Sequence, residues 1–130
     1  MEAAVKWSKV REQFGKPIAQ KQSIHFMIAD MATEIEALRS LVYRTAWLID
    51  TDQPHTKEAA MCKLYASEVS TRCTTLALQI MGSLGYSRDF WMERAFRDAR
   101  IAEIFEGTSE IMRIVIASNL FRPEGVRIAP

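Results

Sequence analysis

The residue whose position most suggests chemistry is Glu106, which lies between the aromatic Phe105 and the flexible Gly107, with Thr108 and Ser109 directly after them. Glycine favours a break between helices, so the carboxylate is expected in a connection between two helical segments. A carboxylate at such a break is a candidate general base. Spacing alone still favours a simpler interpretation, in which Glu106 is a solvated loop acid near the start of a helix.

Other kinds of site find little support in the sequence. His25 and His55 are far apart, and neither belongs to a Cys, His or carboxylate cluster with metal-ligand spacing, so we predict no metal site. The string Gly82–Gly85 (GSLG) would be a weak phosphate cradle and is more typical of a helix end. The seven methionines mostly follow helical spacing, which indicates packing.

Apolar spacing predicts helices along the whole chain, and no alternating run bounded by turns indicates a strand. The expected segments are a helix end at 2–11, helices at 23–50, from 55 or 56 to 82 and from 90 to about 104, and a last helix from 108 or 109. The residues expected to face the core include Val42, Ile49, Trp91, Phe96, Ile104, Ile111, Ile114, Val115 and Ala117. We therefore predict an all-α fold, an up-and-down four-helix bundle at 1–122 with a loose tail at 123–130.

Composition narrows the function classes. The 130 residues include 17 basic and 16 acidic ones that are well mixed, which favours neither nucleic acid nor an anionic membrane as a partner. No stretch approaches the roughly 18 apolar residues of a membrane span, and we expect a cytoplasmic protein. Cys62 and Cys73 fall about 16 Å apart along one predicted helix, too far for a disulfide, so both are expected to be reduced.

Three ordered strings carry a resemblance to a known family: Arg11–Ile18 (REQFGKPI), Gln79–Tyr86 (QIMGSLGY) and Phe105–Ile111 (FEGTSEI). The string Arg97–Ile101 (RDARI) adds to them. In this order and at these separations the chain resembles the C-terminal domain of the acyl-CoA dehydrogenases over about residues 3–120. Any one string would be weak, whereas the ordered set is specific.

The resemblance implies an FAD enzyme that oxidises an acyl-CoA substrate to the trans-2-enoyl-CoA and passes electrons to an electron-transferring flavoprotein. Glu106 matches the family's base, which removes the α-proton while the β-hydrogen leaves as hydride to the flavin N5. In this family the backbone N–H of that glutamate and a flavin ribityl hydroxyl bind the thioester oxygen. Phe105 would line the substrate site, and Gly107 would let the backbone and the acyl chain approach closely.

The same resemblance implies a set of FAD contacts distributed over three segments. The residues that match the family's cofactor contacts are Arg11, Gln13, Phe14, Gln22, Gln79, Gly82, Ser83, Thr108 and Glu110. Arg11 suits the pyrophosphate by charge and fork geometry. Gln79, Gly82 and Ser83 would reach the adenine end from a neighbouring subunit, which implies a homo-oligomer, a dimer or a tetramer.

Complete members of the family carry an N-terminal helical domain and a middle β-domain, and neither is found in these residues. The resemblance therefore implies a C-terminal domain that is inactive by itself, in the cytoplasm or, in a eukaryote, in the mitochondrial matrix. Two alternatives stay open: a helical oligomerisation module without catalysis, and a relative of the acyl-CoA oxidases that uses the same base and flavin.

Overall fold

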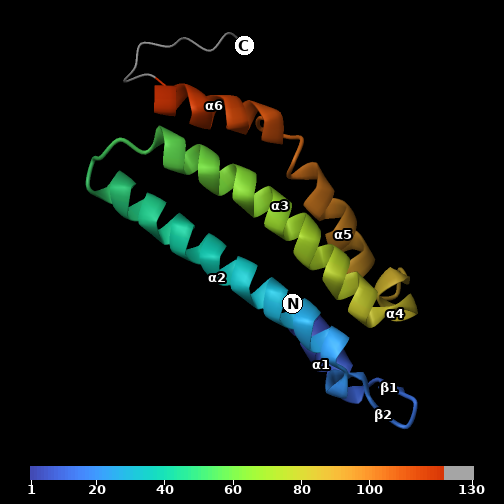
Figure 1. Ribbon diagram of the computed structural model, residues 1–130. Helices are drawn as coiled ribbons and strands as arrows, with labels where there is room; N and C mark the ends of the chain where they lie inside the picture. The colour runs from blue at the N-terminus through green and yellow to red at the C-terminus, as the bar shows by residue number, and fades with distance from the viewer. Residues whose placement is uncertain (122–130) are drawn as a thin grey trace.

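The computed structural model describes residues 1–121, in which helices make up nearly all regular structure (Figure 1). The helical elements are α1 Glu2–Val10, the 3-10 helix η1 Ile18–Gln20, α2 Gln22–Asp50, α3 Thr56–Met81, α4 Ser83–Tyr86, α5 Met92–Ile101 and α6 Ser109–Phe121. The all-α prediction is confirmed. The fourth predicted helix is shorter than expected, and the predicted loose tail at 123–130 lies outside the described residues.

The central element is α3, which packs against α2 on one side and against α5 and α6 on the other. The helices α2 and α3 run antiparallel, because only the short segment 51–55 connects them. On the far side of α3, α5 and α6 follow one another and together cover its length. The fourth position of the bundle is taken by α1, which packs against α3 and the 3-10 helix η1.

Methionine and small side chains build the core where α1 meets the long helices. Met31 and Met92 are fully buried, at 0% and 1% exposure, so the interpretation of the methionines as packing residues is confirmed here. On α1, Ala4 and Ser8 are one turn apart and both buried, which allows this helix to approach α3 closely. The Ser8 hydroxyl stays satisfied because it donates to the Val5 carbonyl at 2.9 Å.

Several residues that were predicted to face the core are exposed, and those predictions are wrong. The exposed fractions are 44% for Val42, 51% for Ile49, 58% for Trp91, 39% for Phe96, 52% for Ile104 and 47% for Ile111. Val42 and Ile49 on α2 and Ile111 on α6 are exposed because α3, the helix that both pack against, covers only part of their apolar faces. Ile114, Val115 and Ala117, by contrast, are half-buried on α6.

A small hairpin was not predicted by the sequence. Strands β1 (Glu12–Gln13) and β2 (Lys16–Pro17) pair antiparallel, joined by Phe14 and Gly15 with φ of +55° and +75°. Two positive φ values are typical of the tight turn that connects twisted strands, which usually carries Asn-Gly or a similar pair. Phenylalanine in the first position hides this signal.

The two cysteines are unbridged, as predicted. Cys73 is buried in the core, and burial raises the pKa of its thiol. Cys62 is only half-buried and lies on the side of α3 that faces α2, where its Sγ is 3.1 Å from the Thr45 hydroxyl.

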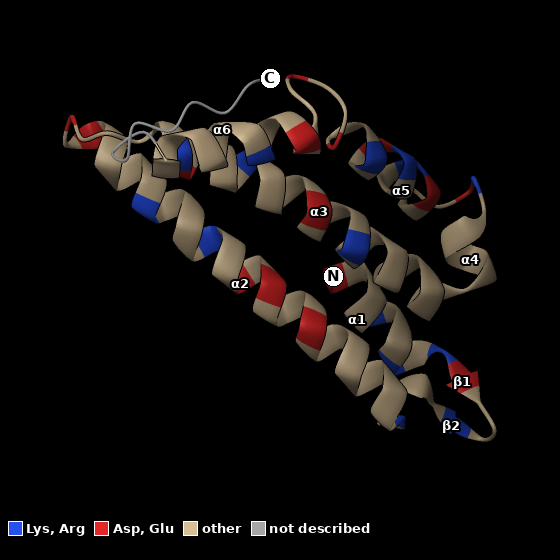
Figure 2. Ribbon diagram, turned by 45° about the horizontal axis from the view of Figure 1, so that its top comes forward, with Lys and Arg blue, Asp and Glu red and all other residues tan. Residues whose placement is uncertain are grey.

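Charges of both signs are interspersed along α2, α3 and α5, whereas α6 carries few (Figure 2). On α6 only Glu110 and Arg113 are charged. Within residues 1–121, none of the helices combines the length and the apolar character that a membrane crossing requires.

Candidate active site

Glu106 lies in the connection between α5 and α6, as predicted, and its backbone adopts an uncommon conformation. Its φ is +52°, and that of Gly107 is +100°. A left-handed conformation costs a residue with a side chain about 1–2 kcal/mol, so neighbouring bonds must hold Glu106 in place. Glycine is favoured at 107 by this φ, and a Cβ there would also lie 2.6 Å from the Met112 Cε. Close packing inside the chain is therefore a second reason for this glycine.

The carboxylate of Glu106 is exposed to solvent. The backbone N–H groups of Glu106, Gly107 and Thr108 donate to no acceptor within residues 1–121. Phe105 and Ile104, directly before them, expose 47% and 52% of their surface. The connection thus presents an acid, free donors and an apolar surface together.

Thr108 and Glu110 organise the start of α6. The Thr108 hydroxyl accepts from the Ile111 N–H at 3.3 Å and so caps the start of the helix. The pKa of Glu110 is lowered, chiefly because its own backbone N–H and then the Thr108 hydroxyl donate to the carboxylate. Glu110 is therefore held in its ionised form at neutral pH.

Most of the predicted cofactor contacts outside the connection between α5 and α6 meet around one cavity of about 570 Å³. Five of them line it: Arg11, Gln13, Gln79, Gly82 and Ser83. The cavity lies where the hairpin and the start of α2 face the end of α3. Segments that are almost seventy residues apart in the sequence therefore form one surface.

Two other predicted contacts lie outside this cavity. Phe14 is 93% exposed at the tip of the hairpin, and Gln22 is exposed at the first turn of α2. Lys21 Nζ lies 4.5 Å from the centroid of the Phe14 ring, a cation–π contact that links the hairpin tip to the cavity wall.

Lys21 lines the same cavity as Arg11 and was not predicted from the sequence. No acidic residue is among the residues that line it, so the cavity has a positive potential. Lys21 is the N-cap of α2, without a side-chain cap bond. Its place two residues before the long predicted helix at 23–50 was the only signal in the sequence that could have pointed to it.

Gly82 and Gly85 shape the turn from α3 to α4, next to the cavity, for different reasons. Gly82 has φ +60° and ψ −136°, a conformation that is essentially restricted to glycine, and it separates α3 from α4. At Gly85 a Cβ would lie 2.8 Å from the Met81 Cβ, so its absence lets α4 fold back onto α3. This string is thus a helix end, as its sequence suggested, and it also turns Ser83 toward the cavity.

The two groups of predicted residues are separate within one chain. The connection that carries Glu106 lies beside the middle of α3, whereas the hairpin lies at its C-terminal end (Figure 1). None of the residues 105–110 lines the cavity at the hairpin.

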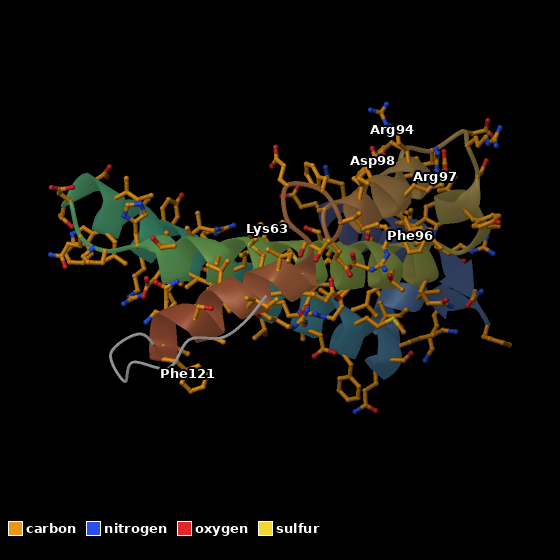
Figure 3. The ribbon with its side chains drawn as sticks, turned by 90° about the horizontal axis from the view of Figure 1, so that it is seen from above. Lys63, Arg94, Phe96, Arg97, Asp98 and Phe121 are labelled. Carbon is orange, nitrogen blue, oxygen red and sulfur yellow. The ribbon has the colours of Figure 1, made fainter. Side chains whose placement is uncertain are left out.

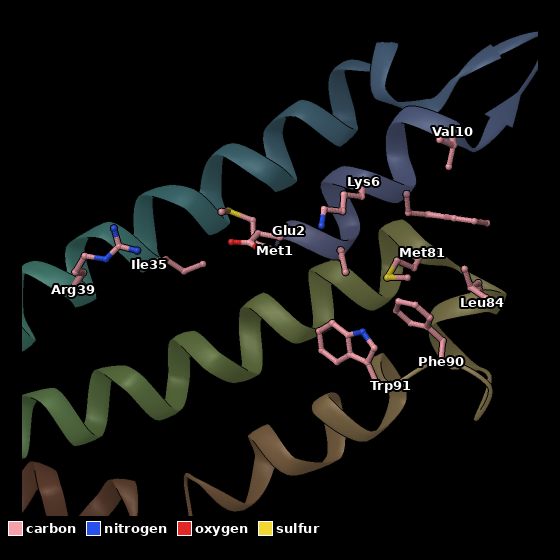
Figure 4. A pocket seen from close by; sticks show the side chains of 12 residues that line it. Met1, Glu2, Lys6, Val10, Ile35, Arg39, Met81, Leu84, Phe90 and Trp91 are labelled. Carbon is pink, nitrogen blue, oxygen red and sulfur yellow. The ribbon is translucent and has the colours of Figure 1, made fainter.

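A second pocket, of about 800 Å³, contains no predicted site residue (Figure 4). It lies between α1, α2 and the start of α5 and is mostly apolar, with Trp7, Ile35, Phe90 and Trp91 in its wall. Within residues 1–121, no group of three His, Cys, Asp or Glu side chains is arranged to hold a metal ion.

A sequence model of the family described as "Acyl-CoA dehydrogenase, C-terminal domain" matches residues 1–121. The chain belongs to this family. The match confirms the resemblance carried by the three ordered strings.

Individual relatives agree with this family. The chain is 49% identical to "Probable acyl-CoA dehydrogenase YngJ" of Bacillus subtilis over 122 residues, which is 94% of this chain and 32% of that protein. It resembles butyryl-CoA dehydrogenase from Megasphaera elsdenii with a TM-score of 0.90 and 46% identity, over 93% of this chain and 32% of that one. It also resembles PigA in an FAD complex, with a TM-score of 0.88 and 33% identity, over 92% of this chain and 31% of PigA.

This acyl-CoA dehydrogenase domain thus spans about a third of the length of the relatives that it matches. It carries the predicted base on one surface and the predicted cofactor cavity on another. What these two surfaces do in a complete protein is a matter of proposal.

Proposed function

We propose that this domain supplies the catalytic base, Glu106, and part of the FAD site of an enzyme that oxidises acyl-CoA thioesters to trans-2-enoyl-CoA. The observation that carries the proposal is the exposure and hydrogen bonding of Glu106. Its carboxylate is exposed, and its backbone N–H donates to no acceptor within residues 1–121. One residue therefore offers an acceptor for a proton and a donor for the oxygen on which enolate charge develops.

In this reaction the Glu106 carboxylate accepts the α-proton of the thioester and becomes a carboxylic acid. Its backbone N–H stabilises the negative charge that develops on the thioester oxygen. Bound FAD would supply the acceptor for the β-hydrogen and its electron pair, so that the two-electron oxidation balances. The apolar side chain of Phe105 helps to exclude water, which strengthens a carboxylate as a base.

The residues at the hairpin fit a cofactor with a pyrophosphate. Arg11 and Lys21 bring two cations to a cavity whose lining contains no acid. A guanidinium binds phosphate oxygens in a bidentate manner, and an ammonium adds a point charge. Gln79 and Ser83 line the same cavity and offer neutral hydrogen bonds to the adenine end of the cofactor.

Glu110 and Thr108 would contact the cofactor on the other surface. The lowered pKa of Glu110 keeps its carboxylate ionised, and an ionised carboxylate repels phosphate but accepts well from hydroxyls. We therefore assign Glu110 to a sugar hydroxyl of FAD. A phosphate group, which the start of a helix can also bind, suits this site less well than a hydroxyl does.

The separation of the two surfaces supports a homo-oligomer in which each FAD site takes residues from two copies. The hairpin cavity of one copy would face the Glu106 connection of its partner. Exposed apolar side chains on α2 and α6, such as Tyr43, Trp47 and Phe121, support an extensive interface, because such surface is costly in water.

Activity would belong to the complete protein, since the relatives are about three times as long as this chain. Its substrate would be an acyl-CoA, and an electron-transferring flavoprotein would reoxidise the flavin, as the family resemblance implies. We propose that the 130-residue chain alone does not turn over acyl-CoA.

The test is Glu106→Gln in the complete protein, compared with Glu36→Gln. Glu36 lies on α2, where it forms an exposed ion pair with Arg39, so its loss controls for the change in charge. We expect Glu106→Gln to keep its FAD and to lose turnover by about 10²–10⁴-fold, the usual contribution of a general base. Bleaching of the flavin by acyl-CoA without oxygen measures the step directly.

Each outcome separates the candidate functions. Turnover within a few-fold of the wild type in Glu106→Gln would place the base elsewhere. A complete protein without flavin would favour the oligomerisation module. Formation of hydrogen peroxide at the rate of substrate oxidation, without an electron-transferring flavoprotein, would favour the oxidase alternative.

A further inference from the structure

We infer that Lys63 is a positioning residue for the proposed base, because its ammonium holds the connection that presents Glu106. This inference rests on the function proposed above. Lys63 lies on α3, and its Nζ donates to the Ala102 carbonyl at 2.8 Å and to the Gly107 carbonyl. The two carbonyls lie on either side of Glu106 in the sequence. Figure 3 shows Lys63 beside the connection between α5 and α6.

Lys63 is bonded in a way that is unusual for a lysine. Its side chain is half-buried, and within residues 1–121 no carboxylate lies within ion-pair distance of its Nζ. An ammonium has three N–H donors, and two of them point to backbone oxygens of one connection. A lysine that only contributed surface charge would extend its end group into water.

The connection has few other bonds near Glu106. The Phe105 N–H donates to Ile101 at 3.0 Å, and the Ser109 N–H donates to Glu103 at 3.0 Å. Between these points, the backbones of Glu106 and Gly107 make one hydrogen bond within the described part of the chain, the bond from Lys63 to the Gly107 carbonyl.

The bond from Lys63 lies in the part of the connection with the least favourable backbone conformation. Glu106 and Gly107 have φ of +52° and +100°, conformations that persist only when the surrounding structure holds them. Thr71 binds the Glu103 carboxylate at 2.5 Å and so fixes the start of the connection, but it reaches neither Glu106 nor Gly107. Lys63 thus connects the rigid helix α3 to the part of the backbone that carries the base.

The Lys63 bonds would affect the reaction through the distance between the Glu106 carboxylate and the α-proton. A base has to meet the α-proton within a narrow range of positions, and a displacement of about 1 Å lowers the rate by about 10²-fold. Loss of the Lys63 bonds would let the Glu106 carboxylate and its N–H move together. Substrate contacts elsewhere in the protein would be unaffected, so kcat should change much more than KM.

The experiment compares Lys63→Met, Lys63→Arg and Lys57→Met in the complete protein. Methionine keeps the length of the side chain and removes its donors. Lys57 lies on the same helix and forms an ion pair with Glu58 at 3.3 Å, so Lys57→Met controls for the loss of charge and stability on α3. Two properties are measured: hydrogen exchange of the bonded amides within 102–109, which are those of 102–105 and 109, and kcat and KM per bound flavin.

For Lys63→Met we expect exchange at 102–109 to rise by about tenfold or more and kcat to fall by about 10²-fold, with KM changed by less than about threefold. Lys63→Arg keeps donors and should recover about a tenth or more of the wild-type kcat. Lys57→Met should change neither property at this connection. Should Lys63→Met fail to fold, Lys63→Gln is measured in the same way.

Unchanged exchange at 102–109 in the Lys63 variants would overturn the inference, and so would raised exchange with an unchanged kcat. These results are distinct from a failure of the proposed function. Turnover retained in Glu106→Gln refutes the assignment of the base and leaves the exchange result intact. Exchange that does not respond to Lys63 refutes the positioning role and leaves the base in place.

Discussion

The conformation at Gly107 makes a quantitative prediction for Gly107→Ala. A φ of +100° is unfavourable for alanine by about 1–2 kcal/mol. The new Cβ would also lie 2.6 Å from the Met112 Cε, and moving that side chain off its rotamer costs about 0.5–1.5 kcal/mol. The free energy of unfolding should therefore fall by about 1.5–3.5 kcal/mol in total.

Urea unfolding of the 130-residue chain, followed by circular dichroism, measures this change. With a slope of about 1–3 kcal/mol per molar urea, the midpoint should fall by about 0.5 M or more. Gly15→Ala is a matched control, because Gly15 has φ +75° and no atom lies within 4 Å of the position that a Cβ would take there. This control should show the backbone contribution alone.

Met112→Ala tests the contribution of the close contact between a Cβ at position 107 and the Met112 side chain. Combined with Gly107→Ala, it removes the close contact, so the double variant should be more stable than the sum of the two single changes predicts, by about 0.5–1.5 kcal/mol. The reasoning is refuted if Gly107→Ala destabilises the domain by less than about 0.5 kcal/mol, since even the backbone contribution exceeds that value.

Two further predictions concern the Glu103 carboxylate and the sharing of each FAD site between two copies. The hydrogen bond from the Thr71 hydroxyl, and after it Arg100, lowers the pKa of Glu103. The ionised carboxylate therefore stabilises the fold above its unfolded pKa of about 4.3, and this stabilisation is lost as the pH falls through the lower pKa of the folded state. Glu103→Gln should therefore flatten the stability profile below about pH 4.3 in acid unfolding, and an unchanged profile would contradict the assignment. If each FAD site takes residues from two copies, co-expressed Arg11→Met and Glu106→Gln forms of the complete protein should recover about a quarter of wild-type activity, because half of the sites in mixed dimers are intact. No recovery in isolated mixed dimers would place both groups in one copy.

Much of the fold was predictable because the two long helices have strong local signals. Apolar residues at helical spacing place α2 and α3 to within about a residue, and Pro54 stops α2 from continuing into the next helix. The hairpin at 12–17 was not predictable in the same way. Its tight turn contains Phe14, which sequence rules do not associate with a positive φ.

Burial was predicted less well than helicity. Trp91 and Val42 have the spacing of core residues, yet both are exposed. Periodicity shows which face of a helix is apolar, but it does not show how much of that face its neighbours cover. In residues 1–121 a single helix, α3, packs against α1, α2, α4, α5 and α6.

The residues of the candidate site, too, were only partly predictable from the sequence. By itself the sequence determined the family, the helical class and the place of Glu106 at a break between helices, because ordered motifs and local backbone preferences suffice for these. Only the tertiary structure brought Arg11 and Gln79 to one cavity and added Lys21 to its wall. Lys63 shows the reason most clearly: its bonds reach 39 and 44 residues along the chain, and nothing local distinguishes it from other helix lysines. Glu106 was identified by its neighbours in sequence, whereas the contact that holds it in position is made by folding.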